Sequence, residues 1–389
     1  MSDPSLKLPE PPAELAELSF ELCTRIVNAI DADGPIPFSR YMAMALYESG
    51  LGYYVNGLHK FGAAGDFVTA PEQGSLFALA LARELDRAAQ ALGPDWTALE
   101  LGPGSGALAR DVLLQLERPP ARYLLLEPSA PLREVQRATL QDLPEDLRAR
   151  VEWIGAPPAS EFDGAIIANE VVDALPVERF GMTGSGIDQY RVTIKNGRLA
   201  WSTAPAEGRL LESVEHIVSD LAEPPGPGYV SEVCVDLAAW LATVTAPLAR
   251  GLVFAVDYGY PRREYYHPDR TEGTLVCHYR HRAHFDPFFW PGLTDISAFV
   301  DFTAVAEAGR RVGLEIAGFT NQAGFVLGSG IAERLDAVTD ERERIRLSGE
   351  LKRLVLPGEM GEKFKLLALV RDFEHSPDAF ALSDQLGRL

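Results

Sequence analysis

The N-terminal part of the chain alternates apolar and polar residues with a helical period. Within residues 13–30, apolar side chains recur at intervals of three and four residues, which predicts an α-helix. Residues 36–49 predict a second helix, entered through Pro37 and capped by Ser39. Residues 50–74 then lose all periodicity, with five glycines ahead of Gly74. We expect an irregular, aromatic-rich loop there, followed by a long helix over residues 75–92.

Short, continuously apolar runs alternate with helical segments from residue 96 onward. Continuous apolar runs separated by helices are typical of a parallel sheet that is covered on both faces. The chain therefore predicts a doubly wound α/β core. The expected strands are 96–101, 121–127, 150–154 and 162–170, and the expected helices between them are 105–116 and 131–140.

Two insertions interrupt this core. Residues 189–203 alternate between polar and apolar side chains around Asn196-Gly197, which is a strong signal for a β-hairpin. We expect the core to resume with a helix near 232–248 and a strand at 251–259, and a second insertion to follow. A helix through Arg311, a strand at 314–320, helical residues 330–354 and a strand at 363–373 complete a seven-stranded sheet, five strands of which are parallel.

These elements divide the chain into five parts. We expect the two insertions to build the surface that binds the substrate, because loops on a rigid scaffold usually determine specificity. The expected parts are an N-terminal helical cap with a glycine-rich lid loop (1–74), the core (75–175 and 230–260), a hairpin region (176–229), a second insertion (261–297), and the C-terminal part of the core with helical additions (298–389).

Charge and composition narrow the range of partners. The 389 residues include 56 acidic and 36 basic side chains and have a formal net charge of -20. Such a surface repels nucleic acid and anionic membranes, and favours a cationic partner. No apolar run approaches the roughly 18 residues of a membrane span. The first twenty residues resemble neither a secretory signal nor a transit peptide, so we expect a cytoplasmic protein. The oligomeric state stays open.

One cluster has the composition of a metal site. The run "CHYRHRAH" contains Cys277, His278, His281 and His284, enough ligands for zinc. Its two arginines add repulsive charge, however, and histidines in such a loop more often form hydrogen bonds or contact a substrate. We therefore expect no metal. The three cysteines, which include no CxxC pair, also argue against a disulfide framework.

The run "ALELGPGSGALARDVL" at 98–113 predicts a strand, a glycine loop and a helix. A nucleotide triphosphate loop needs a Lys followed by Ser or Thr, whereas Ala107 and Leu108 follow Gly106 here. Gly102, Gly104 and Ala107 do fit the permissive form of the dinucleotide fingerprint. The loop alone therefore leaves a nicotinamide cofactor open.

Two acidic residues distinguish these ligands. Glu100 ends the first core strand beside the loop, where a carboxylate repels a pyrophosphate but can bind an amine. Glu127 ends the second strand, where an acid can accept both hydroxyls of a ribose. A helix beginning at Ser105 favours a carboxylate at its N-terminus. Together these features favour S-adenosylmethionine, which combines a sulfonium with an ammonium.

The fourth expected strand ends in "IIANEVVDALPVERF". Asn169, Glu170 and Asp173 emerge there at the carboxyl end of a parallel strand, where open α/β sheets bind their ligands. A carboxylate at this edge can orient a cationic nitrogen and help to remove its proton. We expect these three residues to be catalytic, although Asp173 can equally cap a helix.

At this point the chain resembles the MidA-like S-adenosylmethionine-dependent methyltransferases from about residue 38 to 331. The motifs that match are long: "GYYVNGLHKFGAAGDFVTAPEQGSLF", "ELGPGSGALARDVL", "NEVVDALPVERF", "VDYGYPRREYYHP", "GTLVCHYRHRAH" and "PGLTDISAFVDFTAVAEAG" leading to "TNQAGFVLGSGI". The resemblance implies a class I, Rossmann-like methyltransferase core. It also implies a protein arginine acceptor, since the mitochondrial member of the family dimethylates an arginine.

The resemblance also assigns site residues. It implies that Gly102, Gly104, Gly106 and Glu127 bind the cofactor, that Asn169 and Glu170 face the reacting centre, and that a loop closes over the cofactor. An acidic pocket suits a guanidinium, which stays protonated at neutral pH. The implied loop residues are Gly65, Asp66, Phe67, Thr69, Pro71 and Glu72, and the expected substrate-binding residues are Asp257, Tyr258, His281 and Asp295.

One residue departs from the family pattern. A His is expected where "DISAFVDF" has Phe299, which puts acceptor choice or activity in doubt. The alternative functions are a catalytically weak assembly factor that binds S-adenosylmethionine and a partner protein, and an NAD(P)-dependent oxidoreductase.

Overall fold

The computed structural model describes residues 8–58 and 74–389, and these divide into two compact units. Unit 1 contains residues 8–58, Asp173–Leu237 and Arg262–Phe299. Unit 2 contains residues 74–172, Ala238–Pro261 and Val300–Leu389. In the described part of the chain, no helix is both long and apolar enough to cross a membrane.

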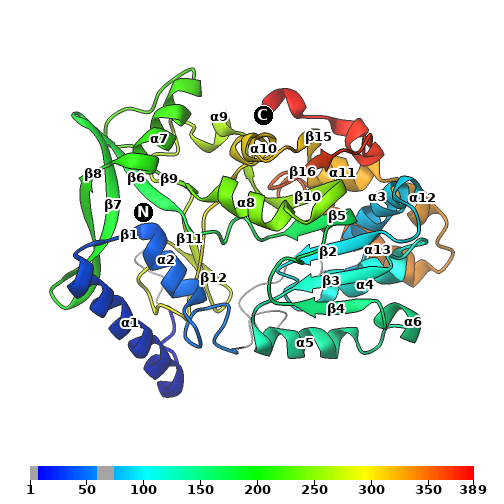
Figure 1. Cartoon of the computed structure of the whole chain (residues 1–389), viewed down its shortest axis with the longest axis horizontal. Helices are drawn as coiled ribbons and strands as arrows, with labels where there is room; N and C mark the ends of the chain where they lie inside the picture. The colour runs from blue at the N-terminus through cyan, green and yellow to red at the C-terminus, as the bar shows by residue number, and fades with distance from the viewer. Residues whose placement is uncertain (1–7, 59–73) are drawn as a thin grey trace. The chain divides into compact units, whose positions relative to one another are not determined.

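Unit 2 is built on an eight-stranded sheet with the order β15-β16-β10-β5-β2-β3-β4, and β14 pairs with β10. Figure 1 shows β5, β2, β3 and β4 side by side in this order. β4, β3, β2, β5 and β10 are mutually parallel, whereas β16 is antiparallel to both of its neighbours. The strands are β2 (Thr97–Leu101), β3 (Arg122–Leu126), β4 (Val151–Ile154), β5 (Phe162–Asn169), β10 (Leu248–Tyr260), β14 (Val300–Asp301), β15 (Glu315–Asn321) and β16 (Phe364–Arg371).

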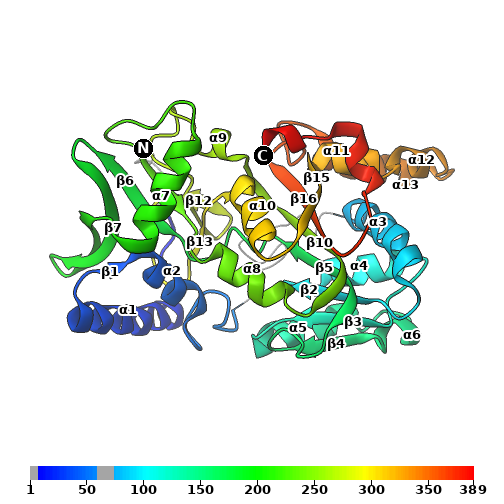
Figure 2. The same cartoon turned by 45° about the horizontal axis from the view of Figure 1, so that its top comes forward.

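Helices cover both faces of this sheet (Figure 2). Leu366 and Ala368 belong to the core cluster that contains α3 and α4, whereas Leu369 contacts Gly309 of α10. Because neighbouring residues of a strand point to opposite faces, α10 covers the face away from α3 and α4. The helices are α3 (Leu76–Leu92), α4 (Ala107–Gln115), α5 (Ala130–Leu140), α6 (Glu145–Arg148), α8 (Leu237–Thr245), α10 (Phe302–Arg311), α11 (Gln322–Gly328), α12 (Ile331–Asp336) and α13 (Glu341–Val355), with 3₁₀ turns η2 (Asp378–Ser383) and η3 (Leu386–Arg388).

Unit 1 contains a five-stranded sheet, a three-stranded sheet and four helices. The larger sheet has the order β1-β7-β6-β9 with β8 paired to β7, and the smaller one has the order β12-β11-β13. The expected hairpin forms between β7 and β8, with Asn196 and Gly197 at φ 52° and 73°. The elements are α1 (Ala13–Asp33), β1 (Ile36–Pro37), α2 (Phe38–Tyr47), β6 (Glu178–Thr183), β7 (Gly186–Lys195), β8 (Arg198–Pro205), α7 (Gly208–Asp220), β9 (Val230–Val233), α9 (Arg262–Tyr265), β11 (Val276–Tyr279), β12 (Arg282–His284) and β13 (Asp295–Ser297).

Three local predictions are wrong. Ser39 does not cap a helix: α2 already begins at Phe38, and the Ser39 hydroxyl donates to Glu178 (2.5 Å). Glu232 does not begin a helix, because it pairs with Arg179 across β9 and β6, and α8 starts only at Leu237. The sheet has one strand more than the expected seven, since the short β14 adds to β10.

Candidate functional site

The glycine loop of unit 2 follows the central strand β2. Gly102, Gly104 and Gly106 have φ values of 55°, 53° and 83°, a region that side chains disfavour. The Gly102 amide donates to the carbonyl of Leu126 at the end of β3 (3.2 Å). Helix α4 begins at Ala107 rather than at the expected Ser105, because the left-handed Gly106 is its N-cap. The loop is thus a tight backbone turn at the carboxyl edge of the sheet.

The loop packs closely against two segments. A Cβ atom on Gly102 would lie 3.3 Å from Val171, and one on Gly106 would lie 3.3 Å from the Cα atom of Gln136. The glycines therefore permit a close approach of the chain after β5 and of helix α5. This cradle fits a ligand that is held by backbone groups, as the cofactor proposed from the sequence requires.

Glu127 lies directly after β3 and is almost fully buried. Its Oε1 atom accepts a hydrogen bond from the amide of Ser129 (2.8 Å), and its Oε2 atom accepts one from Nε2 of Gln136 (3.3 Å). The same Nε2 atom donates to the carbonyl of Gly104 (2.9 Å). The structure therefore brings Glu127 and the loop together through Gln136, a residue that the sequence reasoning missed.

Glu100 is buried in β2, with 2% of its surface exposed. The hydroxyl of Tyr123 donates to its Oε2 atom (2.6 Å). Burial raises the pKa of Glu100 to about 7, and the hydrogen bond from Tyr123 opposes this shift. The partner of Glu100 in this hydrogen bond is therefore Tyr123 of the neighbouring strand β3. The expectation that Glu100 binds an amine stays a prediction.

Asn169 ends β5, and Glu170 follows it with φ 53°. A positive φ is uncommon for residues other than glycine and costs free energy, so the surrounding structure must impose it. The Glu170 amide donates to the carbonyl of Val256 in β10 (2.8 Å), and Asn169 Nδ2 donates to Glu170 Oε1 (3.4 Å). The backbone thus turns sharply at Glu170.

Asp257 of β10 is fully buried and supports this turn. Its Oδ2 atom accepts a hydrogen bond from the amide of Val172, and its Oδ1 atom accepts one from the amide of Tyr258, each at 3.0 Å. Asp257 therefore holds the backbone beside Glu170. The expectation that Asp257 and Tyr258 bind substrate stays a prediction.

Three β-strands of unit 2 therefore carry the expected residues at adjacent ends. In the sheet, β2 lies between β3 and β5. Gly102 follows the carboxyl end of β2, Glu127 follows that of β3, and Glu170 follows that of β5. Parallel sheets bind their ligands at this edge.

The other expected acids belong to unit 1. Tyr54 donates its hydroxyl to Oδ1 of Asp295 (2.9 Å), and Ser297 donates to Oδ2 (3.0 Å). Burial raises the pKa of Tyr54 well above its ordinary value, and the charges of Asp295 and then Asp173 raise it further. The carbonyl of Asp173 accepts the amide of Ala298 (3.1 Å). Asp173 and Asp295 are therefore neighbours within unit 1.

His281 lies elsewhere in unit 1. It is exposed, with φ 59°, in the turn between β11 and β12, while His278 is the residue opposite Asp295 in the register of β11 and β13. The structure therefore does not group His281 with Asp295. Among the described residues, no three His, Cys, Asp or Glu side chains are placed to hold a metal ion.

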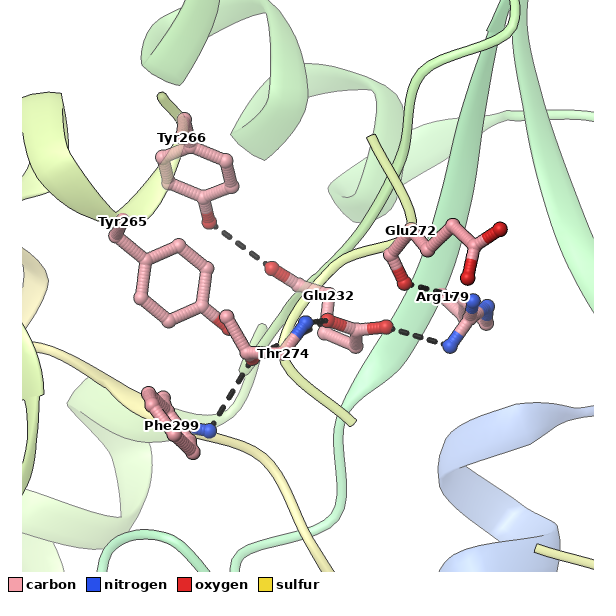
Figure 3. Close-up of polar contacts among 7 residues, drawn as sticks. All are labelled: Arg179, Glu232, Tyr265, Tyr266, Glu272, Thr274 and Phe299. Atoms are coloured by element: carbon pink, nitrogen blue, oxygen red, sulfur yellow. Dashed lines mark hydrogen bonds and ion pairs between the residues drawn. The ribbon is translucent and has the colours of Figure 1, made fainter. Parts of the chain in front are cut away.

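A buried polar network around Glu232 in unit 1 reaches the backbone of Phe299 through Thr274 (Figure 3). The fully buried carboxylate of Glu232 accepts hydrogen bonds from Arg179 (2.7 Å) and from the amide of Thr274 (2.8 Å). The hydroxyl of Thr274 lies 2.9 Å from that of Tyr265 and accepts the amide of Phe299 (3.2 Å). The backbone of Phe299 is thus fixed by Thr274 independently of its side chain.

The expected lid residues Gly65, Asp66, Phe67, Thr69, Pro71 and Glu72 lie outside the described residues.

Comparison with known proteins gives consistent matches. Residues 78–320 match a family described as S-adenosyl-L-methionine-dependent methyltransferases. The Mus musculus protein named protein arginine methyltransferase NDUFAF7, mitochondrial, is 27% identical, with 92% of this chain and 86% of that protein covered. Its Drosophila melanogaster homolog is 28% identical, with 92% and 89% covered. The expectation of a cytoplasmic protein is thereby contradicted, because the curated relatives are named as mitochondrial proteins.

Among solved structures, a protein from Burkholderia thailandensis bound to S-adenosyl-homocysteine has 39% identity and a TM-score of 0.92, with 98% of this chain and all of that chain covered. A native crystal structure from the same organism has 38% identity and a TM-score of 0.88. The α/β fold of the present chain is therefore shared with a protein that binds the demethylated form of the cofactor.

Proposed function

Because the chain belongs to the family of S-adenosylmethionine-dependent methyltransferases, we propose that it transfers the methyl group to an arginine side chain of a protein substrate. The arginine acceptor is taken from the relatives named as protein arginine methyltransferases. The observation that supports the site is the placement of Gly102, Glu127 and Glu170 directly after three adjacent strands of unit 2. A nicotinamide-dependent oxidoreductase, the alternative left by the loop alone, has no support in these matches.

We assign the cofactor to the edge formed by the loop and Glu127. The backbone amides of the loop suit the amino-acid part of the ligand, and the carboxylate of Glu127 suits the two ribose hydroxyls. When bound, S-adenosylmethionine supplies a methyl group on a sulfonium, whose departure leaves a neutral thioether. Because Gly102 and Gly104 have no side chains, the backbone of the loop can approach the bound ligand closely.

Glu170 is the residue that we assign to the acceptor. A carboxylate can accept two N–H groups of a guanidinium in a planar, bidentate arrangement. It can also take the proton that the nitrogen releases when it is methylated. The left-handed backbone of Glu170 is consistent with this assignment, since strained residues concentrate at functional sites.

The test uses the full chain and the Glu170→Gln variant, which keeps the size of the side chain and removes its charge. Both proteins are titrated with S-adenosylhomocysteine, then incubated with tritium-labelled S-adenosylmethionine and an extract of cells that lack the protein. Hydrolysed proteins are analysed for labelled amino acids. We expect equal binding within twofold, labelled ω-N-methylarginine with the wild type, and its loss with the variant.

Each other outcome removes a defined part of the proposal. Label in a different amino acid overturns the arginine acceptor. Full activity of Glu170→Gln removes Glu170 from the mechanism. If the wild type adds no more label than a control without enzyme, only the assembly-factor alternative is left. In that alternative the chain binds the cofactor and a partner protein.

A further inference from the structure

Gln136 stands in the apolar face of helix α5. The buried residues of this helix are Leu132, Gln136 and Leu140, spaced by four residues, so the glutamine occupies the centre of an otherwise apolar stripe. Gln136 has no exposed surface. Burying an amide costs free energy unless its donors and acceptor are paired, so this position must satisfy a specific set of partners.

The amide of Gln136 links three separate elements. Its Nε2 atom donates to the carbonyl of Gly104 in the glycine loop (2.9 Å) and to Oε2 of Glu127 after β3 (3.3 Å). Its Oε1 atom accepts the indole N–H of Trp153 in β4 (3.0 Å). Both ends of the amide are therefore used, and no exchange of its oxygen and nitrogen preserves all three contacts.

We propose that Gln136 is a positioning residue for the cofactor, which holds the glycine loop and the carboxylate of Glu127 in the arrangement that binds S-adenosylmethionine. Glu127 is fixed at both oxygens, by Ser129 on one side and Gln136 on the other. The backbone of α5 also lies against the loop at Gly106. This inference rests on the proposed cofactor site and adds the residue that connects its two halves.

The neutral amide is important because of the charges around it. Glu127 is the adjacent acid, Arg133 and Arg137 lie on α5, and Arg137 stacks over Trp153 at 5.1 Å. Charged side chains on neighbouring elements form ion pairs with one another: Arg110 with Asp111 on α4, and Glu152 of β4 with Arg122 of β3. A carboxylate at position 136 would thus meet Glu127 directly, and two adjacent carboxylates hold a proton to higher pH.

The experiment is calorimetric titration of the full chain with S-adenosylhomocysteine between pH 5.5 and 8.5, for the wild type and Gln136→Glu. At low pH the added carboxyl group is protonated and can donate to Gly104 or Glu127, so the variant should bind S-adenosylhomocysteine with nearly the affinity of the wild type. As the pH rises, the dissociation constant of the variant should increase by roughly tenfold or more relative to that of the wild type. An unchanged ratio of the two constants across this range overturns the proposal.

A matched control separates positioning from general destabilisation. Gln322 is equally buried in unit 2 and donates to the carbonyl of Leu354 (3.1 Å), away from the loop. Gln322→Glu should lower the melting temperature without a pH-dependent loss of affinity. If the two variants lose affinity alike, the effect is structural and the proposal fails.

A second variant covers the case in which Gln136→Glu does not fold. Gln136→Met keeps the volume and removes every hydrogen bond, so its affinity should fall at all pH values while kcat at saturating cofactor stays within twofold. Wild-type affinity in Gln136→Met overturns the inference. Absence of binding by the wild type itself overturns the proposed function, which is a distinct result.

Discussion

The carboxylate of Asp257 accepts the amide of Val172 from 85 positions earlier in the chain, at 3.0 Å. Val172 lies two residues after Glu170, whose own amide donates to Val256, the neighbour of Asp257. Two consecutive residues of β10 therefore determine the path of the backbone on which Glu170 is placed. Glu170 has its left-handed conformation because β10 imposes it.

Asp257→Asn should reduce catalysis more than cofactor binding. The amide side chain offers one acceptor and one donor where two backbone N–H groups need acceptors, so one contact becomes repulsive and the turn at Glu170 shifts. A small misplacement of a reacting group can lower the rate by roughly 100-fold. We expect such a loss in kcat with S-adenosylhomocysteine affinity within threefold, measured by steady-state kinetics and calorimetry.

Stability provides the check on this prediction. Loss of one buried hydrogen bond should lower the free energy of unfolding by about 2 kcal/mol. If the free energy of unfolding of the variant falls by this amount but its kcat stays at the wild-type value, a positioning role for Asp257 is contradicted.

The sheet could be predicted from the sequence because its signals are local. The strands β2, β3 and β5 are continuous apolar runs, and their buried positions follow from that pattern alone. The positions of Glu127 and Glu170 at strand ends could be predicted for the same reason, since each directly follows such a run. A parallel sheet then places residues after adjacent strands at one edge.

The residues that were missed depend on contacts between distant segments. Gln136 falls on the apolar stripe of its helix, but the local sequence shows no partners for a buried amide, and only the loop and Trp153 supply them. Glu232 was assigned to a helix because its pairing with Arg179 in β6 cannot be seen in its local sequence. The conformation of Glu170 likewise depends on β10, which no pattern near residue 170 reveals.

Glu100 should make the stability of the protein depend on pH. Its pKa is raised from 4.5 to about 7 in the folded chain, so between these values the unfolded chain releases a proton that the folded chain retains. This contribution to stability is complete below pH 4.5 and is lost as the pH rises to about 7. The difference amounts to about 3 kcal/mol.

Urea unfolding at pH 5, 6, 7 and 8 measures this effect when the wild type is compared with Glu100→Gln. The difference between the two proteins should change with pH and become constant above pH 7. Glu152→Gln is the control, because Glu152 is exposed and Arg122 lowers its pKa. A difference that is constant over the whole range contradicts the assignment to Glu100.

Thr274 should determine the local stability of the segment that contains Phe299. Its hydroxyl accepts the amide of Phe299 and lies within hydrogen-bonding distance of Tyr265 and Glu232. Thr274→Val keeps the shape and removes these contacts, leaving the amide of Phe299 without this acceptor. The expected cost is about 2 kcal/mol, since the variant loses the buried hydrogen bonds of this hydroxyl together with its bond to the partly buried amide of Phe299.

Hydrogen exchange measured by mass spectrometry locates this loss. The peptide containing Phe299 should exchange roughly 30-fold faster in Thr274→Val, which corresponds to 2 kcal/mol at 25 °C. Thr274→Ser is the matched control, because it keeps the hydroxyl and loses only a methyl group. Its exchange at Phe299 should stay close to that of the wild type. Equal acceleration in both variants would mean that Thr274 acts by packing, and that the network of Figure 3 does not hold the backbone of Phe299.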